Sequence, residues 1–96
     1  MRIEWSPLAL RDREAIFDHI MKADPIAAAG VDERISLAVR RLSDFPESGR
    51  PGRVEGTGEI PVSGAPYVMP YRILEDVVRI LRVIHAARLW PDDLEA

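Results

Sequence analysis

The sequence predicts an α+β domain: an N-terminal strand and an antiparallel helical hairpin, with the hairpin packed on one face of a small twisted antiparallel β-sheet. Apolar residues recur every three to four positions over residues 7–44, as in helices, and the pattern then changes to the alternation of strands. The chain of 96 residues, 47% of them apolar, can build one core only. We therefore expect a single domain over residues 1–91 and a short, loosely held acidic tail over residues 92–96.

The first strand and the first helix meet at a helix-start signal. Residues 1–5 alternate between apolar and charged side chains, which is typical of a half-buried strand. Ser6 can cap a free backbone N–H group, and Pro7 is tolerated there because its missing N–H would have no partner in a first turn. We expect a helix over residues 7–23, although Asp12–Arg13 interrupts its apolar stripe. The stripe consists of Ala9, Ile16, Phe17, Ile20 and Met21.

The second helix repeats the same start signal at Asp24 and Pro25. We expect it to run to about Asp44, with Gly30 weakening its first turns by up to about 1 kcal/mol. Its apolar face consists of Val31, Ile35, Ala38, Val39 and Leu42. Because the turn between the helices is short, they should form an antiparallel hairpin.

Three strands should follow a loop at residues 45–53, where glycine and proline are frequent. We expect strands over residues 59–63, 67–74 and 77–85, joined by turns at residues 63–66 and 75–76. The last strand is the longest and nearly continuously apolar, so it should be central in the sheet. Pro70 has no N–H group to donate and should therefore lie at a bulge or face an unpaired edge.

A two-residue turn at residues 75–76 would fix the pairing of the last two strands. It places Leu74 opposite Val77 and Arg72 opposite Arg79. Directly opposed arginines repel unless an anion or an acidic side chain lies between them. Since no helix follows the last strand, we expect the sheet face away from the hairpin to be uncovered by this chain and to carry its function.

Composition excludes several kinds of site. The chain has no cysteine, which rules out disulfides, thiolate catalysis and cysteine-zinc sites. Its paired acidic residues are adjacent and point apart, so we expect no metal site, and without a glycine-rich phosphate loop we expect no cofactor. The net charge of −3 does not indicate a nucleic-acid partner. Apolar runs are too short for a membrane span or a signal peptide, so we expect a cytoplasmic protein without membrane contact.

Five segments carry a resemblance to a known family. They are Trp5–Pro7, Leu42–Pro46, Gly49–Arg50, Tyr67–Arg72 and Val78–Arg88. In this order, and over essentially the whole chain, they resemble the RelE/ParE superfamily of toxins from bacterial type II toxin–antitoxin systems. The resemblance implies the fold predicted above and a small cytosolic toxin associated with plasmid stabilization. It also implies a hetero-oligomer with a cognate antitoxin that is encoded nearby.

The superfamily has two activities, and this chain resembles the ParE-like branch, which poisons DNA gyrase, more closely. In the branch that cuts messenger RNA on the ribosome, one strand reads Gly-Tyr-Arg-Leu-x-Tyr, and its arginine clamps phosphate. Aligning those tyrosines with Tyr67 and Tyr71 puts Val68 at the arginine position. Arg72 lies on the same side of the strand but about 13 Å further along, at roughly 3.3 Å per residue. We therefore expect a gyrase inhibitor rather than an enzyme.

A ribosome-dependent, metal-independent mRNA endoribonuclease is the alternative, and a non-toxic binding module with the same fold is a second one. As a nuclease, the chain would use His85 with Arg88 and Arg82, because cleavage needs an acid or base beside cations. His85 is otherwise a half-buried residue that ends its strand by bonding a loop carbonyl. His19 is expected to serve packing or to lie on the surface.

The residues expected to bind a partner are Arg72, Arg79, Arg82, Arg88 and Trp90. The arginines would receive acidic side chains of the antitoxin, which should lay a helix over the helical hairpin and a strand along the open sheet face. Alternatively, they are solvent-facing residues whose charges are screened by salt. The rings of Tyr67, Tyr71 and Trp90 favour packing over stacking on nucleic-acid bases.

Overall fold

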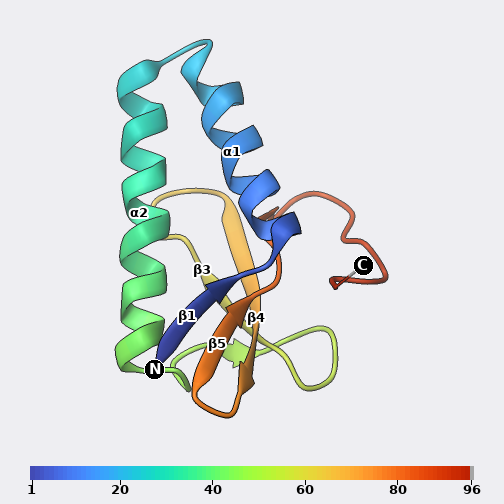
Figure 1. Cartoon of the computed structure of the whole chain (residues 1–96). Helices are drawn as coiled ribbons and strands as arrows, with labels where there is room; N and C mark the ends of the chain where they lie inside the picture. The colour runs from blue at the N-terminus through green and yellow to red at the C-terminus, as the bar shows by residue number, and fades with distance from the viewer. Residues whose placement is uncertain (96) are drawn as a thin grey trace.

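A computed structural model describes residues 1–95 as a helical hairpin standing against one side of a sheet (Figure 1). The elements in chain order are β1 (Arg2–Trp5), α1 (Pro7–Met21), α2 (Pro25–Asp44), β2 (Arg50–Pro51), β3 (Gly58–Pro61), β4 (Tyr67–Leu74), β5 (Val77–Ile80) and β6 (Ile84–His85). The predicted α+β class, with an N-terminal strand and two packed helices, is confirmed. No helix within residues 1–95 has the length and apolar character needed to cross a bilayer.

Both helices begin at the predicted capping residues. The Ser6 hydroxyl accepts a hydrogen bond from the Ala9 N–H at 3.0 Å, and the Asp24 carboxylate accepts one from the Ala27 N–H at 3.1 Å. Each cap satisfies a backbone donor that the helix leaves without a partner. Arg13 then joins α1 to α2 through Asp32, at 2.7 Å. The charged residues that interrupt the apolar stripe of α1 therefore hold long-range contacts.

The sheet is mixed rather than wholly antiparallel. Its order is β1-β5-β4-β3-β2, and β1 runs parallel to β5, whereas the other pairs are antiparallel. Both helices lie between β1 and the other strands in sequence, so β1 can join the far edge in parallel orientation. The predicted pairing of the last hairpin is confirmed, with Arg72 opposite Arg79 and Leu74 opposite Val77. The predicted loop at residues 45–53 contains the short strand β2, which pairs with β3.

The prediction of one continuous strand over residues 77–85 is wrong. β5 ends at Ile80, and pairing with β4 resumes only at Ile84. Between these pairs, two residues of β4 face three residues of the other strand, which makes a bulge. Pro70 lies there as predicted, and its carbonyl accepts a hydrogen bond from the Leu81 N–H at 2.9 Å. The Asp12 carboxylate accepts a hydrogen bond from the Val83 N–H at 2.9 Å, so this N–H does not pair with a neighbouring strand.

The main core fills the space between the helices and the sheet. Its buried members come from both layers, because the apolar sides of the two helices face those of the strands β3, β4 and β5. They are Ala9, Ile35, Val39, Leu42, Ile60, Val62, Met69, Tyr71, Val78, Ile80 and Val83. Tyr71 and Met69, on odd positions of β4, thus face the helices, and the even positions of β4 face the other way.

The sheet face away from the helices is not bare, which corrects the prediction of an open face. A second apolar cluster covers part of it, formed by Leu81, Ile84 and Leu94 with Val54 and Trp90 packed alongside. Leu94 is only 3% exposed. The tail is therefore anchored at Leu94, whereas Pro91, Asp92 and Asp93 are exposed, and Ala96 lies outside the described residues.

Candidate functional site

A cleft of about 560 Å³ lies between α1 and the segment that follows the bulge. It collects chemistry-bearing side chains from three elements. Its lining includes Asp12, His19, Tyr67, Arg82, His85 and Arg88, with apolar walls from Ile16, Val83, Leu89 and Pro91. The three residues proposed for a nuclease are thus brought to one place.

The positive charge of Arg82 is paired with a carboxylate of the same chain inside this cleft. Its guanidinium donates two hydrogen bonds to the Asp12 carboxylate, at 2.7 and 3.0 Å, and the two side chains are only 22% and 17% exposed. The hydrogen bond with Asp12 raises the pKa of Arg82 above its ordinary value, so Arg82 stays charged and paired. The geometry of this fork leaves Arg82 engaged with its own chain instead of pointing at a ligand.

His85 is half-buried at the end of β6. Its Nδ1 accepts a hydrogen bond from the Ala87 N–H at 3.1 Å, and its ring meets Tyr67 edge to face, with the centroids 5.5 Å apart. The expectation of a bond to a loop carbonyl is therefore wrong, because the loop supplies a donor. This contact orients the ring, so that Nε2 is the ring nitrogen left for other partners.

Arg88 and His19 complete the polar lining. Arg88 is exposed, and within residues 1–95 no carboxylate pairs with its guanidinium. His19 lies on α1 at seven positions from Asp12, which places both on one side of the helix and toward the cleft. The seven-residue spacing of Asp12 and His19 is the sequence signal for this shared side of α1.

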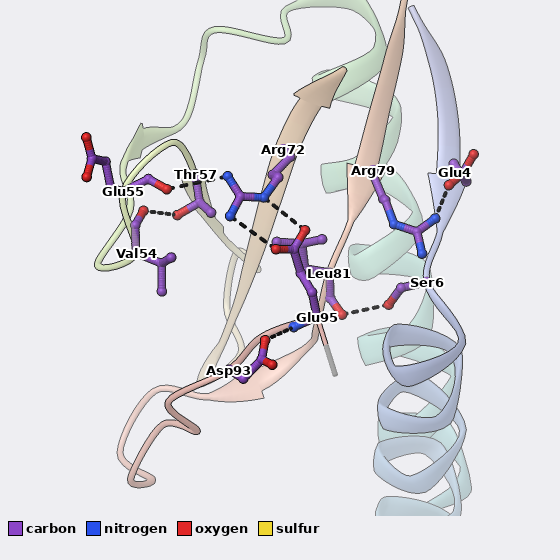
Figure 2. A network of polar contacts seen from close by, with 10 residues as sticks. All are labelled: Glu4, Ser6, Val54, Glu55, Thr57, Arg72, Arg79, Leu81, Asp93 and Glu95. Atoms are coloured by element: carbon purple, nitrogen blue, oxygen red, sulfur yellow. Dashed lines mark hydrogen bonds and ion pairs between the residues drawn. The ribbon is translucent and has the colours of Figure 1, made fainter. Parts of the chain in front are cut away.

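Arg72 and Arg79 lie on the opposite side of the sheet from the helices, at directly opposed positions of β4 and β5 (Figure 2). Each is paired with a carboxylate of this chain. Arg72 binds both oxygens of Glu95, at 2.9 and 3.1 Å, and Arg79 binds Glu4 of β1. The hydrogen bond to Glu95 raises the pKa of Arg72 above its ordinary value. The acidic groups that the opposed arginines require are thus Glu95 and Glu4 of the same chain.

Trp90 lies at the start of the tail and is packed on one side by a cation. The Arg53 guanidinium stands 3.8 Å from the centroid of its ring, and its Nε1 is buried with no hydrogen-bond partner within residues 1–95. The five predicted partner-binding residues therefore fall into two groups. Arg82 and Arg88 line the cleft, whereas Arg72, Arg79 and Trp90 belong to the sheet face and tail.

The cleft has limited catalytic equipment. It presents one arginine without a carboxylate partner among residues 1–95 and the two imidazoles of His19 and His85, and Val68, at the position of the phosphate-clamping arginine, is buried in the sheet. Among residues 1–95, no three His, Asp or Glu side chains gather closely enough to hold a metal ion. The arrangement can receive an anion or a partner side chain, but it lacks the convergent cations that stabilise a phosphoryl transition state.

Comparison with known proteins agrees with this fold. Residues 3–90 match the family model described as ParE toxin of type II toxin-antitoxin system, parDE. The chain belongs to the ParE toxin family. It is therefore the toxin of a type II toxin–antitoxin system of the RelE/ParE superfamily, and the resemblance carried by the five sequence segments is confirmed.

Two curated relatives cover nearly all of this ParE-family chain. "Putative toxin Y4kP" of Sinorhizobium fredii is 48% identical over 93 residues, which are 97% of this chain and 96% of that protein. Toxin RelE2 of Caulobacter vibrioides is 36% identical over 88 residues, or 92% of this chain and 98% of that protein. Both of these relatives carry the word toxin in their names.

Two solved structures share the fold of this ParE-family toxin. A chain of the chromosomal ParDE TA system from P. aeruginosa has a TM-score of 0.80 at 27% identity, covering 88% of this chain and 95% of that one. A chain of the toxin-antitoxin complex RelBE2 from Mycobacterium tuberculosis has a TM-score of 0.57 at 30% identity, with the same coverage of both chains. The arrangement described above is thus similar to that of solved superfamily structures.

Proposed function

We propose that this toxin acts by binding and disabling DNA gyrase without breaking a covalent bond, and that a cognate antitoxin neutralises it. The observation that carries the proposal is the pairing of Arg82 with Asp12, which removes one of the two cations beside His85. A gyrase inhibitor needs a binding surface but no acid–base machinery. Such a target would place the toxin in the cytoplasm.

The cleft is poorly equipped for cutting RNA. Metal-free cleavage needs a group that activates the 2′-hydroxyl, cations for the charged transition state, and an acid for the leaving oxygen. With Arg82 held by Asp12, only the exposed Arg88 remains for the phosphate, and the buried Val68 has no charge to add. The net charge of −3 also opposes binding to a polyanion.

An antitoxin partner is supported by the solved relatives, whose titles name a ParDE system and a toxin-antitoxin complex. The helical hairpin has a surface that suits an amphipathic helix of such a partner. Its large apolar side chains Leu10, Met21, Ile26 and Leu37 are between 44% and 86% exposed. Apolar groups of this size gain free energy when a partner covers them. We therefore propose a hetero-oligomer with the antitoxin.

Brief expression in bacteria tests the gyrase proposal. We expect double-strand DNA breaks and an SOS response with intact transcripts, and inhibition of purified gyrase in a supercoiling assay. His85→Ala should remain fully toxic, because the imidazole performs no chemistry in this mechanism. His19→Ala, which removes the other histidine of the same cleft, is the matched control. Codon-phased cuts in transcripts within minutes, abolished by His85→Ala but kept by His19→Ala, would contradict the proposal.

The endoribonuclease remains the second candidate because His85, Arg88 and Arg82 do line one cleft. In that case Asp12 would have to release Arg82 when RNA binds. The same expression experiment separates the two, since a nuclease yields cut transcripts without DNA breaks. A non-toxic binding module would yield neither and would leave growth unchanged.

A further inference from the structure

One end of the molecule carries exposed apolar side chains that belong neither to the cleft nor to the helical surface proposed for the antitoxin. It lies away from the turn between α1 and α2, where the N-terminus, the end of α2 and the β4–β5 turn come together (Figure 1). Residues 1–2, 43–48 and 73–76 form this surface, and we call it the base. Its large apolar side chains are between 36% and 62% exposed and consist of Met1, Phe45, Ile73 and Leu74. Apolar groups that gather on one surface within a polar rim indicate a binding partner.

Hydrogen bonds join the three segments of the base. The Ser43 hydroxyl at the end of α2 donates to the Met1 carbonyl, which fixes the start of the chain on the helix. The Arg2 N–H donates to the Asp76 carbonyl at 3.1 Å, which fixes the same segment to the β4–β5 turn. The base is therefore one surface and not three separate loop tips.

Two hollows shape the base. One of about 520 Å³ lies beside Phe45, another of about 310 Å³ lies beside Ile73, and Glu47 lines both. Tyr71 also lines the second hollow, and its hydroxyl accepts the Gly49 N–H at 3.1 Å, which holds the loop in place. The hollows are thus formed before a partner binds, and this lowers the ordering cost of binding.

The rim of the base is negatively charged. Its four acidic side chains are exposed, and within residues 1–95 none of them forms an ion pair. These side chains are Asp44, Glu47, Glu75 and Asp76. The cations beside them are Arg2 and, lining the hollow of Phe45, Arg41, so four acids stand against two cations. A partner segment with lysine or arginine would complement this charge, whereas an acidic segment would be repelled.

Glu75 has an unfavourable backbone conformation at the tip of the β4–β5 turn. Its φ of 54° lies in the left-handed region, which glycine and asparagine adopt more easily than glutamate. The carboxylate is exposed and has no cation partner among residues 1–95 that would offset this cost. Strain at an exposed side chain that does not stabilise the fold indicates a role in contact with another molecule.

We propose that the base is the surface with which this toxin binds its target protein, through a target segment that places an apolar side chain next to lysine or arginine. The apolar side chain enters the hollow beside Phe45 or Ile73, and the cation faces the acidic rim. This inference rests on the proposed function, in which the target is DNA gyrase. The target is favoured over the antitoxin because the antitoxin is expected to bring acidic groups to the arginines of the sheet, and the base would repel them.

Removal of the apolar contacts is the first test. Phe45→Ser/Leu74→Ser should fold, because both side chains are largely exposed in the natural chain. We expect the toxin concentration that half-inhibits supercoiling by purified gyrase to rise about tenfold or more. Affinity for the purified antitoxin encoded beside this chain, measured by titration calorimetry, should be unchanged and also reports that the variant is folded.

Removal of the rim charge is the second test. Glu47→Gln/Glu75→Asn keeps the side chains polar, and asparagine tolerates the positive φ at the turn. This variant should resist urea at least as well as the natural chain, yet should need about threefold more protein for half-inhibition of gyrase. Glu33→Gln is the matched control, because it removes an exposed carboxylate of α2 outside the base and should leave inhibition unchanged.

The outcomes distinguish this inference from the proposed function. Unchanged inhibition by either double variant would overturn the inference and leave the gyrase proposal standing. Weaker antitoxin binding with inhibition retained would assign the base to the antitoxin, and a toxin dimer that dissociates in Phe45→Ser/Leu74→Ser during sedimentation would assign it to a second copy; each result would overturn the inference. Failure of the natural toxin to inhibit gyrase would overturn both proposals.

Discussion

Single side chains bind distant segments of this small toxin together. Tyr71 is the clearest case, because its ring is in the main core while its hydroxyl donates to the Pro46 carbonyl at 3.0 Å and accepts from the Gly49 N–H at 3.1 Å. The hydroxyl thereby fixes the loop between α2 and β2. Burial raises the pKa of Tyr71 above its ordinary value, with Glu47 adding to the rise and the Gly49 N–H opposing it.

The raised pKa of Tyr71 predicts a loss of stability in alkali. The folded state holds the phenol proton more tightly than the unfolded state, so the stabilisation is complete below about pH 10 and is lost as pH rises through the folded pKa. Tyr71→Phe should cost about 1–2 kcal/mol at pH 7 through its lost hydrogen bonds, and should show less alkaline loss. Urea unfolding from pH 7 to 11 measures both effects. Tyr67→Phe, on the same strand, is the control, and an unchanged alkaline slope in Tyr71→Phe would contradict the assignment.

At the scale of elements, the bulge opposite Pro70 decides which residues face which side. Ile80 faces the helices and Leu81 faces the other side, as strand alternation requires. The extra residue then shifts the alternation, so Val83 returns to the main core and Ile84 joins Leu81 in the second cluster. The bulge therefore brings Leu81 and Ile84 to the same side of the sheet, where they form the second cluster with Leu94.

Two glycines in different elements give opposite predictions for the same substitution. A Cβ at Gly58 of β3 would lie 2.6 Å from the Tyr71 ring, whereas one at Gly30 of α2 would meet nothing within 4 Å. Gly58→Ala should destabilise by about 1–3 kcal/mol because the ring must move. Gly30→Ala should stabilise by up to about 1 kcal/mol, since alanine favours a helix. Urea unfolding at pH 7 compares them, and equal effects of the two variants would show that the packing at Gly58 is not tight.

At the scale of the whole molecule, charge separates this toxin from RNA-binding proteins. The net charge is −3, and five of the thirteen cationic side chains form ion pairs with carboxylates of the same chain, namely Arg13, Arg50, Arg72, Arg79 and Arg82. With these five charges paired and a net negative charge, the electrostatic attraction of the chain for a polyanion is weak. The surface is better suited to a protein that brings its own acidic and apolar groups.

We therefore expect weak binding to RNA. The toxin should bind a labelled 20-nucleotide RNA with a Kd weaker than about 100 µM at 0.15 M salt, measured by fluorescence anisotropy. A repeat at 20 mM salt is the positive control for residual electrostatic attraction. Submicromolar binding that falls steeply with added salt would contradict this expectation and would favour the endoribonuclease.

The sequence by itself determined the elements whose signals are local. Ser6-Pro7 and Asp24-Pro25 start the helices, the spacing of Ile35, Val39 and Leu42 marks a buried helix face, and Pro70 marks a bulge. Capping, periodicity and a missing N–H group act within a few residues, so they can be identified without a structure. The interruption of the α1 stripe at Asp12 is also a local signal, whereas its partner Arg82 is distant in the sequence.

Only the tertiary structure decided where the charges go and what covers the sheet. The ion pair of Asp12 and Arg82 joins residues that are 70 positions apart in the sequence, and the ion pair of Arg72 and Glu95 joins residues 23 positions apart. The parallel pairing of β1 with β5 and the burial of Leu94 against Leu81 and Ile84 also depend on contacts between distant segments. Such contacts form because the folded core brings together groups whose sequence surroundings are unrelated. Local patterns therefore predicted the arginines as binding residues, and the folded chain showed that three of them are already occupied.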